Sequence, residues 1–430
     1  MSLAFSLLLV IFVLAFVIRM PLAYGMISAG IVYLAFSGAD LGNAAQLMMG
    51  GYYSKFILIA VPLFIFGAQI MNDSTVTERI FHFAHGVVGR LHGGLAQVNV
   101  LNSVIFSGMS GSAVADASGA GLMEIKAMAD GGYPKAFACA TTAATATIGP
   151  IIPPSIPMVI YAYLSGASVG MLFAGGMLPG IVLAGMQMVL IRFVARRRGF
   201  PREAWPGMGN LLGRFLATFP ALLAPVILLG GIYSGAFTPT EAAAVASLYA
   251  LLLAFLVYRS MSPAAFLEMF RTVVKQTATV TLIIGGAFLI NYAVASEGLP
   301  RKIAEAILSI TDNRLALLLL LNVLFLLMGM FLDTLVLLLI MIPIVLPILG
   351  QAGIDPVHFG VVITLNMMIG LSTPPFGVIL FVVSSMTRTP LKDVIHEIWP
   401  FLGVMIVTLV ILVLAPDIVL LVPRMLGYPG

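Results

Sequence analysis

An acid at position 333 is the residue of this sequence with the clearest potential for chemistry. Asp333 lies in a long apolar stretch, between Met328–Leu332 and Thr334–Leu338. A carboxylate in such surroundings is costly and usually has a function. Its oxygens suit a hard cation such as Na⁺, by analogy with the oxygen ligands of Ca²⁺ and Mg²⁺. Aspartate is also a good helix N-cap, and the two roles are compatible.

Two breaks in the apolar pattern look like copies of each other. A constant offset of 221 residues pairs Gly149 with Gly370 and the dipeptide Pro153-Pro154 with Pro374-Pro375, without a gap. Proline lacks an N–H group and clashes with the preceding turn, so a helix must unwind there. The freed carbonyls can coordinate a cation, and paired interrupted segments in the two halves of a membrane protein indicate a transport site.

Hydroxyl side chains cluster at the breaks. They can bind a carboxylate or Na⁺, or they can bond to nearby backbone as many Ser and Thr do in membrane helices. The clustered residues are Ser110, Ser112, Thr145, Thr147, Ser372 and Thr373. Asp116 follows Ser112 by one helical turn and is either a site residue or a packing partner. Glu241 fits a capping box in Thr238-Pro239-Thr240-Glu241, although it is also an acid near a membrane edge.

The composition is that of a polytopic membrane protein. Of 430 residues, 61% are hydrophobic and 9% are charged, against about 25% charged in soluble domains. Many apolar runs exceed the ~20 residues that span a bilayer. The single cysteine, Cys139, excludes an internal disulfide and a cysteine-rich metal site. There is no basic stripe interleaved with aromatic residues, so no nucleic-acid partner is expected.

The apolar pattern predicts an all-α fold of about ten transmembrane helices and two re-entrant hairpins. The helices are expected at 3–19, 21–37, 54–72, 133–163, 170–191, 214–233, 240–258, 276–296, 354–385 and 399–422, and the hairpins at 93–130 and 313–350. Those at 133–163 and 354–385 are the broken helices. Segments 73–92 and 297–313 read as interfacial helices, with an ordinary loop helix as the alternative.

The distribution of basic residues predicts the topology. With the N-terminus outside, sixteen lysines and arginines fall on the cytoplasmic side and five on the outer side, as the positive-inside rule requires. Each half then has five crossings, so the two halves are inverted repeats and both termini are periplasmic. The expected division is a first repeat at 1–198, a cytoplasmic linker at 199–212 and a second repeat at 213–430.

Five motifs spread over the whole chain resemble those of one family, the DctM-like large membrane subunits of TRAP (tripartite ATP-independent periplasmic) transporters, within the ion-transporter superfamily. The motifs are Ser107–Asp116, Gly149–Ser155, Gly235–Ala244, Gly329–Thr334 and Gly370–Gly377. Each is weak alone, and the joint match is specific.

The resemblance implies a scaffold that holds a mobile domain of two hairpins and two broken helices. It implies Na⁺-coupled uptake by an elevator movement in the bacterial inner membrane. It also implies two partners, a small membrane subunit of four helices and a periplasmic substrate-binding protein. The implied substrates are small organic anions such as C4-dicarboxylates, 2-oxo acids and sialic acid.

The resemblance also implies two Na⁺ sites, several of whose ligands would be backbone carbonyls. One site would use Ser110, Gly149, Ile152 and Pro154, and the other Gly329, Asp333, Gly370, Thr373 and Phe376. The substrate would lie between them, against Ser112, Thr145, Thr147, Ser155, Thr334 and Ser372. No lysine or arginine at membrane depth is expected to hold a carboxylate, so helix N-termini, hydroxyls and Na⁺ would do so.

Two other functions compete with this interpretation. A one-component Na⁺/carboxylate carrier of the same superfamily would need no binding protein. An intramembrane serine protease is suggested by Gly108-Met109-Ser110-Gly111, which matches a nucleophile pattern. A protease needs a general base beside the serine, and His358 is expected near the opposite membrane surface.

Overall fold

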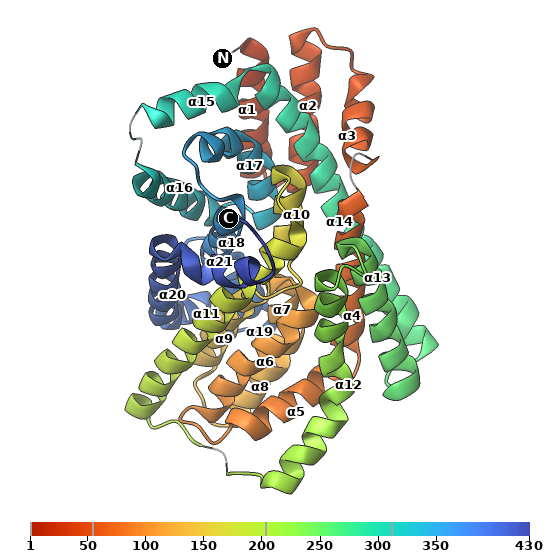
Figure 1. Cartoon of the computed structure of the whole chain (residues 1–430), viewed down its shortest axis with the longest axis vertical. Coiled ribbons are helices and arrows are strands. Elements are labelled where there is room, and N and C mark those ends of the chain that lie inside the picture. The colour runs from red at the N-terminus through yellow and green to blue at the C-terminus, as the bar shows by residue number, and fades with distance from the viewer. Residues whose placement is uncertain (1, 54–55, 203, 310, 312) are drawn as a thin grey trace.

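The computed structural model of this chain describes residues 2–53, 56–202, 204–309, 311 and 313–430, and in these residues every regular element is helical (Figure 1). The helices of the first half are α1 Leu3–Val17, α2 Leu22–Ser37, α3 Asn43–Tyr53, the 3₁₀ turn η1 Phe56–Ile59, α4 Ala60–Asp73, α5 Val76–Val88, α6 Gly94–Ser110, α7 Ala113–Ser118, α8 Ala120–Asp130, α9 Lys135–Thr145, the 3₁₀ turn η2 Ala146–Ile148, α10 Ile156–Ser165 and α11 Val169–Arg198.

The second half repeats this order. Its elements are α12 Met208–Tyr233, α13 Pro239–Leu252, the π-helical turn η3 Leu253–Val257, α14 Pro263–Ser296, α15 Leu299–Leu308, α16 Arg314–Gly329, α17 Thr334–Gln351, α18 Pro356–Leu371, α19 Val378–Thr387, α20 Leu391–Leu414 and α21 Pro416–Met425. Seven helices among the described residues are long and apolar enough to cross a membrane, and six shorter apolar helices include α1, α2 and the pieces α10, α18 and α19 of the broken helices.

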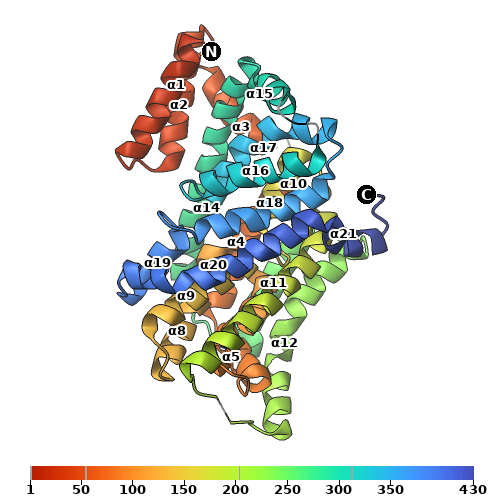
Figure 2. The same cartoon turned by 90° about the vertical axis from the view of Figure 1, so that its left-hand side faces the viewer.

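Elements related by the 221-residue offset pack in equivalent pairs. Helix α4 packs on α13 of the other half, and its counterpart α14 packs on α2. The hairpin leg α17 packs on α10, and its counterpart α7 packs on α19. In Figures 1 and 2, α8 of the first hairpin lies in the lower half of the molecule and α17 of the second in the upper half. The two halves therefore interlock, and each broken helix pairs with the hairpin of the other half.

Several predicted boundaries were wrong. Helix α3 was not predicted, α14 begins thirteen residues before the expected 276, and α12 begins at Met208, inside the expected linker. The segment 399–422 is two helices, α20 and α21. The apolar pattern marks only the part of a helix that lipid or protein covers, whereas backbone hydrogen bonding continues into polar sequence. Helix α14 starts at an N-cap, Ser262, whose hydroxyl oxygen accepts from the Ala265 N–H. Pro263 follows at the first helical position, where proline is favoured.

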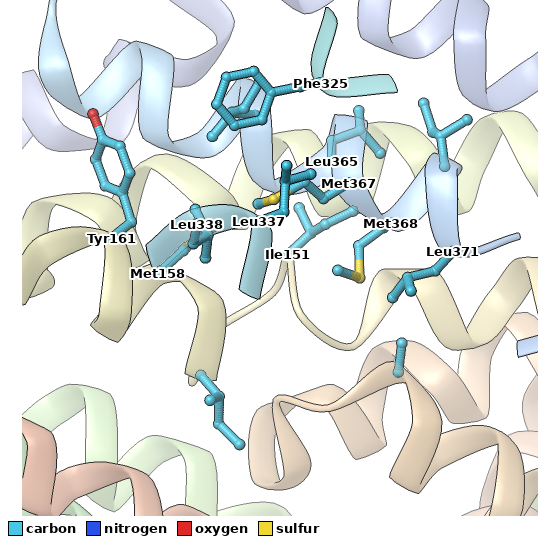
Figure 3. Packing of buried hydrophobic residues seen from close by; sticks show 14 of the residues in the cluster. Ile151, Met158, Tyr161, Phe325, Leu337, Leu338, Leu365, Met367, Met368 and Leu371 are labelled. Carbon is cyan, nitrogen blue, oxygen red and sulfur yellow. The ribbon is translucent and has the colours of Figure 1, made fainter. Parts of the chain in front are cut away.

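The first break is a loop, 149–155, that joins η2 to α10 and is buried in the centre of the molecule. Helix α11 accommodates it with two glycines: a Cβ at Gly176 would lie 2.2 Å from the carbonyl oxygen of Ile151, and one at Gly180 would lie 2.2 Å from the Ile152 side chain. Figure 3 shows Ile151 in the packed layer near Met368 and Leu371 of α18. The break is therefore held by close packing from both halves.

Candidate functional site

The tip of the first hairpin turns at Gly111 and rests against the first break. Gly111 has φ 62°, a left-handed conformation that glycine adopts without strain. A Cβ there would lie 2.5 Å from the carbonyl oxygen of Pro154. Ser112 then caps α7, because its hydroxyl oxygen accepts from the Ala115 N–H at 3.4 Å. The turn and the cap together bring the end of α6 and the start of α7 onto the loop 149–155.

A buried carboxylate lies at this contact. Asp116 is 4% exposed, and its Oδ1 accepts a hydrogen bond from the Ser110 hydroxyl. Its Oδ2 is buried without a hydrogen-bond partner, and a Cβ at Gly149 would lie 2.2 Å from it. Of the residues expected at the first Na⁺ site, Ser110 and Gly149 thus meet around Asp116. The sequence left the role of Asp116 open, and the structure places its unsatisfied oxygen between these two residues.

The second hairpin has the equivalent turn with an acid in the capping position. The Oδ1 of Asp333 accepts from the Leu335 N–H at 2.9 Å, so this carboxylate caps α17. At the end of α16, Gly329 contacts Gly370 of α18 so closely that a Cβ on Gly370 would lie 2.8 Å from the Gly329 carbonyl carbon. Two backbone segments expected at the second Na⁺ site are therefore in direct contact.

The remaining residues of that expected site lie just beyond α18. The Thr373 hydroxyl donates to the Ile369 carbonyl at 2.6 Å. The Phe376 side chain is 46% exposed and packs its ring against Phe331 with 5.4 Å between centroids. Only the backbone of Phe376 is therefore a possible ligand. In the first break, Pro154 presents its carbonyl to Gly111, and Ile152 packs its side chain against α11.

A cavity of about 400 Å³ separates the two hairpin tips. This size is within the range of small-molecule sites. Residues of both hairpins, of both broken helices and of helices α4 and α14 line it. The polar residues that line it are Gln69, Ser110, Ser112, Ser118, Gln276, Thr279, Asp333 and Thr334. Ser112 and Thr334, both expected to contact substrate, line the cavity, but the Thr334 side chain is 4% exposed and its hydroxyl oxygen is buried without a hydrogen-bond partner.

The other four hydroxyls expected at the substrate are buried elsewhere. Thr145 donates to the Asn99 side chain, and Thr147 donates to the Ala144 carbonyl at 2.5 Å. Ser155 caps α10 at the Met158 N–H, and Ser372 donates to the Ala143 carbonyl at 3.3 Å. None of the four is among the residues that line the cavity. In this conformation their hydroxyls fix the broken helices rather than face a solute.

A second, more polar space continues from the cavity. It has a volume of about 550 Å³ and shares Gln69, Ala115, Ser118 and Gln276 with the cavity. It is also lined by Thr77 and Glu78 of α5, which lies toward the lower end of the molecule in Figure 1. In the part of the chain that the structure describes, neither space is lined by lysine or arginine.

Two interlocked halves, each with a hairpin and a broken helix, enclose a central cavity, which is the architecture of a membrane transport protein. The family described as "Tripartite ATP-independent periplasmic transporter, DctM component" matches residues 9–418. This chain belongs to that family, so it is a large permease subunit of a TRAP transporter and not an enzyme. The family implies two further components, a small membrane subunit and a periplasmic binding protein, and a location in the inner membrane.

Named relatives match over nearly the whole chain. The sialic acid TRAP transporter large permease protein SiaM of Vibrio cholerae is 42% identical over 411 residues, which are 95% of this chain and 96% of the relative. The C4-dicarboxylate TRAP transporter large permease protein DctM of the same species is 33% identical over 99% of this chain and 99% of the relative. The YdaH transporter of Alcanivorax borkumensis shares the fold, with a TM-score of 0.63 over 88% of each chain at 16% identity.

Proposed function

We propose that this chain moves a small organic anion across the membrane together with Na⁺. The observation that carries the proposal is the contact of each hairpin with a glycine of a broken helix. In the first half Asp116 lies at Gly149, and in the second Gly329 contacts Gly370 while Asp333 caps the next hairpin leg. A carboxylate oxygen, a hydroxyl and unwound carbonyls form an oxygen-rich set suited to a hard cation.

In this proposal Na⁺ is cargo that supplies the missing positive charge. Ser110, Asp116 and the carbonyls of Gly149, Ile152 and Pro154 hold one ion. Gly329, Asp333, Gly370, Thr373 and the backbone of Phe376 hold the other. The organic anion lies between the two ions, against Ser112 and Thr334. This arrangement explains how a cavity without lysine or arginine among its described lining residues accepts an anion.

The substrate class is a carboxylate, in keeping with relatives named for sialic acid, C4-dicarboxylates and 2,3-diketo-L-gulonate. The transport movement is an elevator displacement of the hairpins and broken helices past α4 and α14. The basic residues near the linker support an orientation with that end in the cytoplasm and both termini in the periplasm. The cavity continues toward the α5 end of the molecule, so the conformation is inward-facing.

The partners are a four-helix small subunit and a periplasmic substrate-binding protein that delivers the anion. The sialic acid TRAP transporter permease protein SiaT of Haemophilus influenzae is 36% identical to this chain. The matched region is 97% of this chain and 68% of SiaT. The alternative of a one-component carrier predicts transport without either partner.

Reconstitution in liposomes tests both possibilities. The complete transporter is expected to take up sialic acid or a C4-dicarboxylate only with an inward Na⁺ gradient and only with its binding protein outside. Uptake that persists when choline replaces Na⁺ would exclude the coupling. Uptake by this chain alone, at the rate of the complete system, would favour the one-component carrier.

A further inference from the structure

The cavity between the hairpin tips has few hydrogen-bond donors available for an anion. An organic anion that enters it exchanges bonds to water for bonds to protein, because a carboxylate buried without partners is costly. The described lining residues include no lysine or arginine, so the donors must be neutral. The relevant question is which neutral donors are not already used.

Most cavity hydroxyls have partners within the protein. Ser110 donates to Asp116, whereas Ser118 and Thr279 donate to carbonyls one turn back at 2.8 and 3.0 Å. Ser112 uses its oxygen as an acceptor in the cap of α7, which leaves its proton to donate. The Thr334 hydroxyl has no partner, but its oxygen is buried. Among the described hairpin residues that line the cavity, Ser112 therefore offers an accessible hydroxyl donor, and Thr334 offers one only after its side chain changes rotamer.

Two glutamine amides outside the hairpins supply further donors. Gln69 of α4 and Gln276 of α14 are the residues with side-chain N–H groups among the described residues that line the cavity. Both also line the second, more polar space of about 550 Å³, called the vestibule below, so they lie where the two spaces join. The offset does not relate the two positions, because it pairs Gln69 with Ile290 and Gln276 with Lys55. The amide pair is therefore not a by-product of the duplication.

Both amides are able to bind a solute at little cost, because one has a weakly held partner and the other has none. The Gln69 amide donates to the two carboxylate oxygens of Asp73, one turn on in α4, at 3.1 and 3.0 Å. The Asp73 side chain is solvent-exposed, so this bond has a small net value. A carboxylate in the cavity is the same kind of acceptor. Gln276 has no hydrogen bond to any described residue and is exposed to the same space.

We propose that Gln69 and Gln276 form an amide pair that binds the anionic group of the transported solute at the neck of the cavity. They are specificity-determining residues on the long helices, whereas Ser112 and Thr334 are on the hairpins. The inference rests on the proposed function and adds a fixed part of the binding site to it. A neutral amide accommodates oxygen acceptors of varied geometry, whereas an arginine fork favours a planar carboxylate.

The test uses the complete transporter in liposomes, with labelled sialic acid and labelled succinate as probes. Gln69→Leu and Gln276→Leu remove the donors at similar size. Gln351→Leu, at the exposed end of α17 and outside the lining of both spaces, is the matched control. Each cavity variant is expected to raise the half-saturating anion concentration about tenfold, since a lost hydrogen bond to a charged group is worth about 1.5 kcal/mol or more.

Three further readouts separate solute binding from a structural role. The maximal rate, the half-saturating Na⁺ concentration and the melting temperature of both leucine variants are expected to match those of Gln351→Leu. Gln69→Glu, which has the same shape but places a second carboxylate beside Asp73, is expected to weaken anion binding more than Gln69→Leu. An unchanged half-saturating concentration in the Gln69→Leu/Gln276→Leu double variant would overturn the inference and leave the proposed function intact. Failure of the wild type to take up either anion would remove both.

Discussion

Each hairpin tip carries one acid, but the two acids occupy different positions in the duplicated pattern. The offset of 221 residues pairs Asp333 with Ser112, and both cap the second leg of their hairpin. The same offset pairs Asp116 with Leu337, which is fully buried. The capping role is therefore common to both copies, whereas the first copy has its carboxylate one turn further along the helix. The two proposed cation sites are expected to differ in affinity for this reason.

Asp333→Asn tests the second site at the scale of one residue. Asparagine is as good an N-cap as aspartate, so α17 should persist. The half-saturating Na⁺ concentration for uptake is expected to rise about 100-fold, because loss of one buried charged partner costs about 3 kcal/mol or more. Asp393→Asn, on the exposed start of α20, is the control. An unchanged Na⁺ curve would leave Asp333 with the capping role alone.

Asp116→Asn tests the first site. The Ser110 hydroxyl can still donate to Oδ1, but the oxygen that faces Gly149 is replaced by an N–H group. We expect the purified protein to lose most of its Na⁺-dependent thermal stabilisation, since a ligand stabilises the folded state only in proportion to its binding. The measurement is the melting temperature in NaCl and in choline chloride. Equal stabilisation by Na⁺ in variant and wild type would contradict this role.

The broken helices are held in place by backbone contacts at glycines. Gly111 contacts the carbonyl of Pro154, and Gly370 contacts Gly329. Helix α11 contributes Gly176 and Gly180 beneath the loop 149–155. The carbonyls proposed as cation ligands are thus fixed by neighbouring elements rather than by the loop itself. The packing of α11 on the loop should then control the first cation site.

Gly176→Ala tests this packing at the scale of one element. Its Cβ would lie 2.2 Å from the Ile151 carbonyl oxygen, so the loop or α11 must shift. Overpacking of this kind costs about 1–3 kcal/mol, and stabilisation by Na⁺ is expected to fall. Gly185→Ala on the same helix is the control, because no atom lies within 4 Å of its Cβ position. Full stabilisation by Na⁺ in Gly176→Ala would show that the loop position does not determine the site.

At the scale of the whole molecule, the two halves form one cavity between them. Ser112 of the first hairpin and Thr334 of the second line the same space, although α8 and α17 of these hairpins lie in the lower and upper halves of the molecule. That space continues to the second space, which is lined by Thr77 and Glu78 of α5. Both hairpin tips are therefore reached from one side in this conformation.

Thiol labelling tests this arrangement in a Cys139→Ala background. A cysteine at Ser112 is expected to react with a membrane-impermeant reagent from the cytoplasmic side in the inward-facing state, and substrate should protect it. A cysteine at Thr334, which is 4% exposed, is expected to react from the same side but more slowly. Arg197→Cys and Arg301→Cys, on exposed surfaces of α11 and α15, mark the two sides. Reaction of either tip together with the Arg301 marker, and without the Arg197 marker, would contradict the inward-facing conformation.

The sequence by itself determined the class of fold and the places where it is interrupted. Apolar composition, the 221-residue offset and the proline pairs predicted an all-helical membrane protein with two hairpins and two broken helices. These features are local, because hydrophobicity and the missing N–H group of proline act on a segment wherever it lies. Asp333 was identified in the same way, as an acid within an apolar run.

Only the tertiary structure decided which polar groups meet. Ser110, Asp116 and Gly149 come from α6, α7 and the first break, and their contact depends on a turn at Gly111 that no periodicity encodes. From the sequence, Thr145 and Ser112 were both predicted to contact the substrate. In the structure the Thr145 hydroxyl donates to Asn99, whereas Ser112 lines the cavity. Gln69 and Gln276 gave no signal in the sequence at all. A hydroxyl or an amide can bond to backbone, side chain or solute with similar energy, so its role is set by which acceptor the packing of distant segments brings within reach.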